Sequence, residues 1–193
     1  MEFNSEIYLS PMYTKDDYKR LNLSTSSDEM CWKQAVDIFS DRIKGRFLSQ
    51  IQTLSKDINS NGFAIMALNC LLVETILQFE IGVNSTSNCN SQQYSAFLHN
   101  SFPNAFTSID SAIYFYRHIR CGILHSAQTK GKSKLTCDNS YIVKYDGLDV
   151  TVSVQRFSNL LNDYFEDYKR KLLDKNETDL RSNFIKKMGY VCR

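Results

Sequence analysis

The sequence contains little glycine and proline, with 7 Gly and 2 Pro among 193 residues. This scarcity argues against collagen-like, low-complexity and turn-dense all-β sandwich folds. No glycine-rich phosphate loop follows a predicted strand, and no Gly-x-Ser-x-Gly turn is present. Rossmann, P-loop and serine-hydrolase chemistry are therefore not expected.

The six cysteines form no Cys-x-x-Cys pair and show no spacing typical of zinc ligands, so we predict no metal site. Three of them, Cys31, Cys70 and Cys121, fall inside helical patterns and resemble small buried apolar residues. Residues 1–20 are polar and charged and lack the apolar core of a signal peptide. We therefore expect reduced thiols and a cytoplasmic protein.

No membrane segment is predicted either. The most apolar run, residues 63–79, contains Asn69, Glu74 and Gln78 and is short for a bilayer span. The overall composition is that of an ordinary globular protein, with 42% hydrophobic, 12% aromatic and 23% charged residues. A chain of this length can bury about 70% of its unfolded surface, enough for a core without disulfides.

The first half of the chain shows the periodicity of two helices. Ser26 and Glu29 have the spacing of a capping box, and a long amphipathic helix is expected from there to about Lys56. Its apolar positions recur every three or four residues, at Trp32, Ala35, Val36, Phe39, Ile43, Phe47, Ile51 and Leu54. Residues 59–62 (Asn-Ser-Asn-Gly) are expected to break it, and 63–80 forms a helix apolar nearly all round, typical of a bundle centre.

The second half alternates between helical and strand patterns. A short helix is expected over 93–100, and a second begins at the capping-box spacing of Thr107 and Asp110 and runs through Ile123. After a polar loop at 126–133, alternating apolar residues on both sides of Asp146-Gly147 predict a β-hairpin. An amphipathic helix over 157–172 and a short tail helix near 180–188 follow.

These elements predict an all-α fold, a helical bundle with a β-hairpin inserted near residues 141–154. Residues 1–25 form a polar N-terminal segment, and 26–193 form a single helical domain that includes the hairpin and the C-terminal tail helix.

Charge is concentrated in one segment. Between Ser111 and Cys137 there is no Asp or Glu, whereas Arg117, Arg120, Lys130, Lys132 and Lys134 supply five positive charges. The whole chain carries only +2, so the rest of it is net acidic. Such a focused positive field attracts phosphates, although a lysine-rich solvated loop would have the same composition.

Arg120 is predicted to lie near the middle of the apolar face of its helix, at ~100° per residue. An arginine there is costly unless it meets an acid, a partner chain or a phosphate. The obvious acid to meet it is Glu74, in the middle of the most apolar helix. Two interpretations stay open: a buried ion pair that only fixes the bundle, or an arginine retained for a ligand.

His125 follows Arg120 at a distance of five residues, just after Gly122. On an ideal helix the two side chains would diverge by ~140°, so they converge only if the helix bends or ends near Gly122, or if the arginine reaches round. Histidine changes protonation near neutral pH, which suits proton transfer. His118 could share the face of His125 or be solvated.

The stretch Arg120-Cys-Gly-Ile-Leu-His125 resembles the Arg-x4-6-His motif of the HEPN superfamily of small helical-bundle domains. The apolar helix that contains Glu74, the continuation Ser-Ala-Gln-Thr-Lys and the following hairpin and helix are also similar to one stand-alone HEPN branch, over roughly residues 28–173. The resemblance implies a metal-independent endoribonuclease without cofactors, of the kind found in toxin–antitoxin, phage-defence and RNA-processing systems.

In this family the ribose 2′-OH attacks the adjacent phosphodiester. The resemblance implies that Arg120 holds the phosphate and His125 transfers the proton, with Glu74, Cys121 and His118 in support. The residue after the arginine is often polar in active members, whereas here it is Cys121. RNA is the implied ligand, with Arg117, Lys130, Lys132 and Lys134 as its phosphate contacts.

The family also implies a homodimer whose two motifs face one cleft, and an antitoxin or another protein is a further partner it allows. The alternative hypothesis is a non-catalytic helical binding module for RNA, nucleotide or a protein partner.

Overall fold

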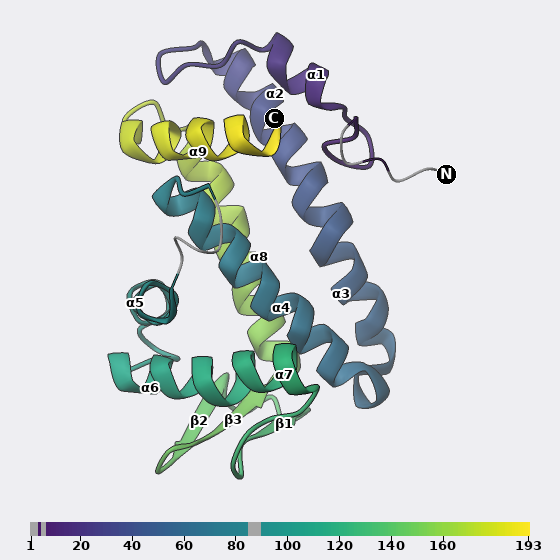
Figure 1. Cartoon of the computed structure of the whole chain (residues 1–193), viewed down its shortest axis with the longest axis vertical. Helices are drawn as coiled ribbons and strands as arrows, with labels where there is room; N and C mark the ends of the chain where they lie inside the picture. Colours follow the sequence, from purple (N-terminus) through teal and green to yellow (C-terminus); the bar gives the residue numbers. More distant parts are fainter. Residues whose placement is uncertain (1–3, 5–6, 85–89) are drawn as a thin grey trace. The chain divides into compact units, whose positions relative to one another are not determined.

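The computed structural model describes residues 4, 7–84 and 90–193 and is mostly helical (Figure 1). Its contacts divide the chain into two compact units. The first comprises Met1–Gln50, Gln78–Asn88 and Asp163–Arg193, and the second comprises Ile51–Leu77 and Cys89–Asn162. The single domain expected over 26–193 stays a prediction.

The first unit contains α1 (Lys15–Arg20), α2 (Glu29–Ile43), the π-helical segment η1 (Lys44–Leu48), the C-terminal part of α8 (Val154–Leu173) and α9 (Thr178–Val191). Its core is aromatic: the ring of Phe39 lies 4.5 Å from that of Phe79 and 5.3 Å from that of Phe184. The tail helix predicted near 180–188 is the longer α9.

The N-terminal caps of this unit differ from the sequence prediction. The side chain of Asp28, not that of Ser26, accepts the N–H of Cys31 at 2.8 Å and begins α2. Ser26 is instead bonded to Ser24 in the preceding turn. Helix α1 lies within the segment expected to be only polar, and Thr14 and Asp17 form a capping box there that was not predicted.

The break between the first two long helices also lies earlier than predicted. A 3-10 turn, η2 (Ser55–Asp57), separates α3 (Ser49–Leu54) from α4 (Ile58–Ile81). Residues 59–62 belong to the first turns of α4, because Asn61 there donates to the carbonyl groups of Leu54 and Asp57 and satisfies the backbone at the turn.

The second unit contains most of α4, then α5 (Ser91–Ser101), α6 (Ile109–Tyr114), the π-helical segment η4 (Phe115–Arg120), α7 (Cys121–Ser126) and the start of α8. Ser108, rather than Thr107, caps α6, and its capping-box partner is Ser111. The α5 helix agrees with the predicted helix over 93–100.

The predicted hairpin is confirmed as β2 (Val143–Asp146) and β3 (Asp149–Ser153). Because Asp146 pairs with Asp149, the loop residues are Gly147 and Leu148, and only Gly147 has a positive φ, +59°. This is the type II′ pattern rather than a central Asp-Gly pair. A third strand, β1 (Lys134–Thr136), pairs in parallel with β3 and was not predicted.

The helical stretch Glu29–Ile81 is long and apolar enough to cross a membrane by length and composition. Of its most apolar part, 56% is buried inside the protein, as in many core helices. Of the cysteines expected to be buried, Cys70 is buried, whereas Cys31 and Cys121 are partly exposed.

Candidate functional site

Arg120 and Glu74 form an ion pair inside the second unit. Arg120 ends η4, Glu74 lies in α4, and Nη2 of the arginine donates to Oε2 of the glutamate at 2.6 Å. The two side chains are only 12% and 8% exposed. Burial by itself lowers the pKa of Arg120, but the hydrogen bond and the negative charge of Glu74 outweigh it and raise that pKa above its ordinary value. The pair expected from the sequence is present.

His125 joins this pair through the arginine. Nη1 of Arg120 lies 3.2 Å from Nε2 of His125, so the long guanidinium side chain bridges a gap that an ideal helix would leave open. A guanidinium has only donors, so Nε2 accepts this hydrogen bond and the imidazole carries its proton on Nδ1. His125 lies at the exposed edge of the site.

Two tyrosines pack next to Arg120, one directly and one through the other. The Tyr116 ring lies 5.4 Å from the guanidinium carbon of Arg120, within cation–π distance, and Tyr94 packs edge-on against Tyr116 at 5.1 Å. The Tyr94 hydroxyl donates to the Cys70 carbonyl at 3.4 Å, and burial raises the pKa of Tyr94. The contact of Tyr116 with Arg120 could have been predicted, because the two residues are four positions apart on one helix. Tyr94 comes from α5, and no local sequence pattern indicates its contact with Tyr116.

The guanidinium is incompletely satisfied. Its Nε is buried and has no hydrogen-bond partner, whereas Nη1 and Nη2 are held by His125 and Glu74. Cys121, expected to support the site, lies near Tyr116: burial raises the pKa of Tyr116, and the charge of Cys121 raises it further.

His118 faces the basic loop instead of the Arg120 centre. Its Nδ1 lies 3.2 Å from Oγ of Ser133, and its carbonyl accepts the N–H of Lys130 at 3.0 Å. Ser133 in turn accepts the N–H of Val150 at 2.9 Å. His118 therefore ties the loop between α7 and β1 to both η4 and the sheet.

The predicted phosphate contacts lie on or beside this anchored loop. The side chains of Arg117, Lys130, Lys132 and Lys134 are exposed. The loop packs closely against α7 at Gly122, which has no side chain: a Cβ there would lie 2.4 Å from the carbonyl oxygen of Gln128. The loop is thus held by backbone contacts while its cations reach solvent.

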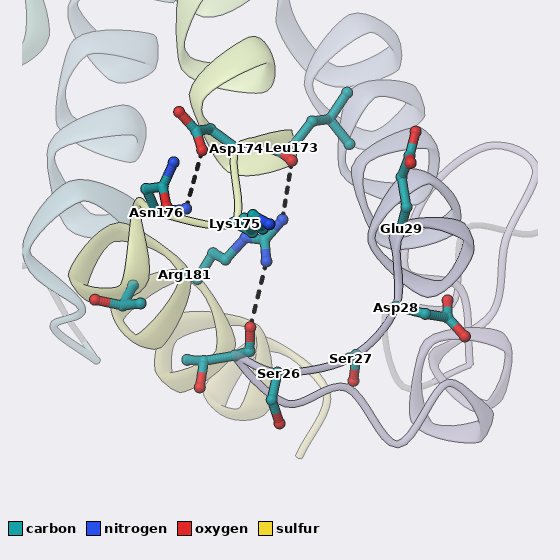
Figure 2. Close-up of a pocket in the computed structure, with 11 residues that line it drawn as sticks. Ser26, Ser27, Asp28, Glu29, Leu173, Asp174, Lys175, Asn176 and Arg181 are labelled. Carbon is teal, nitrogen blue, oxygen red and sulfur yellow. Dashed lines mark hydrogen bonds between the residues drawn. The ribbon is translucent and has the colours of Figure 1, made fainter.

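The first unit has a pocket of its own, of about 690 Å³ (Figure 2). It lies between the start of α2 and the α8–α9 connection and contains none of the predicted site residues. Arg181 donates there to the carbonyl groups of Leu172, Thr25 and Leu173 and stacks on Trp32 at 4.3 Å. These bonds hold the C-terminus of α8 and occupy all three nitrogens of the guanidinium.

No group of three or more His, Cys, Asp or Glu side chains suited to a metal ion occurs in the described part of the chain. Comparison of the sequence with protein-family models and curated proteins, and of the structure with solved structures, finds no significant match.

Proposed function

We propose that this protein is a metal-independent endoribonuclease of the HEPN type. The observation that carries the proposal is a single arginine, Arg120, bonded at once to an acid, Glu74, and to a histidine, His125, at the exposed edge of a tyrosine-backed site. These groups suit phosphate binding and proton transfer, and they lie in the same unit as an exposed basic loop.

The reaction assigned to this site is an internal displacement at phosphorus. The ribose 2′-oxygen forms a bond to the adjacent phosphorus while the bond from phosphorus to the 5′-oxygen breaks. His125 accepts the proton of the 2′-OH, the leaving 5′-oxygen takes up a proton from water, and His125 then returns its proton to the solvent. Arg120 stabilises the charge that builds on the phosphoryl oxygens. The products are a 2′,3′-cyclic phosphate and a 5′-OH.

The hydrogen bond between Arg120 and His125 keeps His125 from acting as a base before RNA binds. The lone pair on Nε2 of His125, which must accept the 2′-OH proton, is occupied by an N–H of Arg120. A phosphate that draws Nη1 of Arg120 onto its own oxygens releases this lone pair. Substrate binding and release of the base are therefore the same event.

The basic loop provides affinity in this scheme. Lys130, Lys132 and Lys134 contact phosphates along the RNA, and Arg117 adds a further cation on η4. A homodimer, an antitoxin partner and a role in toxin–antitoxin or phage-defence systems stay predictions that follow from the HEPN resemblance. A cytoplasmic location stays a prediction from the polar residues 1–20 and the cysteine pattern.

One observation favours the alternative, a non-catalytic binding module. Both terminal nitrogens of Arg120 already have partners within the protein, as in an ion pair that only stabilises the fold. The two functions differ in whether His125 is needed for bond cleavage.

The test is a cleavage assay on single-stranded RNA in EDTA. His125→Ala should abolish cleavage and leave RNA affinity within a few fold, because the lysines still bind phosphate. Arg120→Lys should lose cleavage, since an ammonium cannot replace the planar guanidinium, whereas the exposed control Arg117→Lys should keep it.

The product should carry a 2′,3′-cyclic phosphate, and RNA with a 2′-deoxy nucleotide at the cut site should resist. If His125→Ala cleaves as fast as wild type, or if EDTA stops the reaction, the mechanism is wrong and the binding module is the better conclusion.

A further inference from the structure

We propose that Arg42 and Arg46, in the first unit, form a binding site for a phosphate group, separate in the chain from the Arg120 site. The two arginines lie one helical turn apart at the junction of α2 and η1. Both point at one acceptor: Nη1 of Arg42 donates to the Leu9 carbonyl at 2.6 Å, and Nη2 of Arg46 donates to the same oxygen at 3.3 Å.

This arrangement brings two like charges together at one neutral acceptor. Neither arginine forms an ion pair with a carboxylate in the described part of the chain, whereas the deeply placed Arg120 has Glu74. The shared acceptor is a neutral peptide oxygen, and each guanidinium has five N–H donors. Most of those donors are therefore left for a ligand or for water.

The electrostatic environment of the two arginines favours an anion. Burial lowers the pKa of Arg42 to about 10, and the positive charge of Arg46 contributes in the same direction. Burial also lowers the pKa of Arg46. Among the described residues, the thiol of Cys192 favours the charged form of Arg42. A bound anion would remove the repulsion and stabilise both charges.

The turn formed by Leu9–Met12 packs on α2 and η1 and holds the two arginines in place. Oδ2 of Asp41 accepts the N–H of Met12 at 2.8 Å, which fixes one end of the Leu9–Met12 turn to α2. Gly45 lies between the two arginines, and a Cβ there would lie 2.3 Å from Cγ of Pro11. The turn thus packs directly on the helix backbone, so the arginines that bond Leu9 are pre-positioned.

The local helix geometry is a second, independent indication. Segment η1 (Lys44–Leu48), which contains Arg46, is π-helical, and π turns are uncommon and are frequent at functional sites. The chain's other described π-helical segment, η4, ends at Arg120. Each π segment of the described chain therefore carries an arginine of a candidate phosphate site.

The ligand class follows from the donors. Two guanidinium groups that converge from one helix face match an oxyanion with several acceptor oxygens, and phosphate offers these with a high charge. The phosphate could be inorganic phosphate or a group of an RNA backbone, which presents the same oxygens to the arginines.

The test measures binding to the full chain by titration calorimetry, first with inorganic phosphate and then with a short single-stranded RNA made uncleavable by 2′-deoxy substitution. Arg46→Gln should weaken phosphate binding roughly tenfold, the loss expected for one charge-assisted contact. Arg46 is the better choice than Arg42, because its bond to Leu9 is the longer one and its side chain is the more exposed of the two.

Lys44→Gln is the matched control, because it removes one positive charge from the same π segment and Lys44 is exposed. It should leave the affinity within about twofold. If inorganic phosphate binds and Arg46→Gln weakens it, the site takes free phosphate. If only the RNA binds and Arg46→Gln weakens it more than Lys44→Gln, the RNA backbone is the source. Equal effects of the two substitutions, or no binding of either ligand, would overturn the proposal.

Discussion

At the scale of single residues, Glu74 supplies the charge that lets Arg120 stay inside the second unit. Glu74→Gln would leave the arginine nearly buried without a counter-charge, with its cation–π contact to Tyr116 as the remaining compensation. We expect a loss of roughly 3 kcal/mol in the free energy of unfolding, measured by urea denaturation. The control Glu166→Gln removes a half-exposed partner of Lys169 and should cost less than about 1 kcal/mol.

A loss for Glu74→Gln no larger than that for Glu166→Gln would mean that water already stabilises Arg120. The ion pair would then not be a determinant of the fold, and its retention would speak more strongly for a ligand.

Glu80 makes stability depend on pH. Burial raises the pKa of Glu80 above its ordinary value of 4.5, and the hydrogen bond from Tyr164 and the charge of Lys171 offset only part of this. A carboxyl group with a raised folded-state pKa contributes stability below its ordinary pKa, and that contribution is lost as the pH rises through the folded value. Ionised Glu80 therefore destabilises the protein near neutrality.

Glu80→Gln keeps an acceptor for the Tyr164 hydroxyl, which lies 2.8 Å from Oε1 of Glu80, and has no proton to lose. The variant should be more stable than wild type at neutral pH, and its advantage should shrink toward pH 4.5. Urea denaturation across this range checks the prediction. Parallel pH profiles for the two proteins would show that Glu80 keeps its ordinary titration in the folded state.

Residue chemistry explains which part of the site was predictable. An arginine on an apolar helical face requires an acid, and Glu74 lies in the middle of the apolar helix, whereas Glu80 lies at its end. The bond from Arg120 to His125 could not be derived, because ideal helix angles place the two side chains apart and the π-helical segment that ends at Arg120 was not predicted. Tyr94 was missed because sequence gives no sign of which helix will pack against Tyr116.

At the scale of elements, Gly122 decides how the basic loop meets α7. Gly122→Ala would place a Cβ 2.4 Å from the Gln128 carbonyl oxygen, a backbone atom that cannot swing aside. The loop would have to shift, and we expect a cost of about 1–3 kcal/mol by thermal or urea unfolding. The control Gly189→Ala, in α9, meets nothing within 4 Å and should gain about 0.5–1 kcal/mol.

If Gly122→Ala and Gly189→Ala have the same effect, the loop does not pack on α7 as described. Binding of RNA gives a second measure, because a shifted loop carries Lys130 and Lys132 with it.

Elements with a strong local signal were predictable, and those set by packing were not. Alternation on both sides of Gly147 identified the hairpin, since a two-residue turn is a local property. Strand β1 has only three residues, and its parallel pairing with β3 depends on where the chain returns. The π segments η1 and η4 likewise follow from packing, because their sequences continue ordinary helical periodicity.

At the scale of the whole molecule, composition predicted a mostly helical fold because scarce glycine and proline leave long uninterrupted periodic segments. It could not predict that contacts would divide the chain into two units assembled from non-contiguous segments. Helices α4 and α8 each contribute to both units, and nothing in the local pattern of a helix marks where its neighbours change.

Charge distribution is the whole-molecule property that the proposed function uses. RNA binding should weaken with salt, since each neutralised phosphate releases counterions and, for a single strand, contributes about −0.7 to the slope of log K against log salt. Replacement of Lys130, Lys132 and Lys134 by glutamine should therefore make the slope shallower by about 2. Cleavage of saturating RNA should stay near wild type, because the lysines touch neither Arg120 nor His125 in the described structure.

The matched control replaces Lys169, Arg170 and Lys171 by glutamine, which removes the same total charge from α8. These cations are already paired with Glu166 and Asp167, so they should contribute little to phosphate binding. Filter binding at several salt concentrations measures both slopes. If the two triple variants change the slope equally, net charge attracts the RNA, and the anchored basic loop has no special part in holding it.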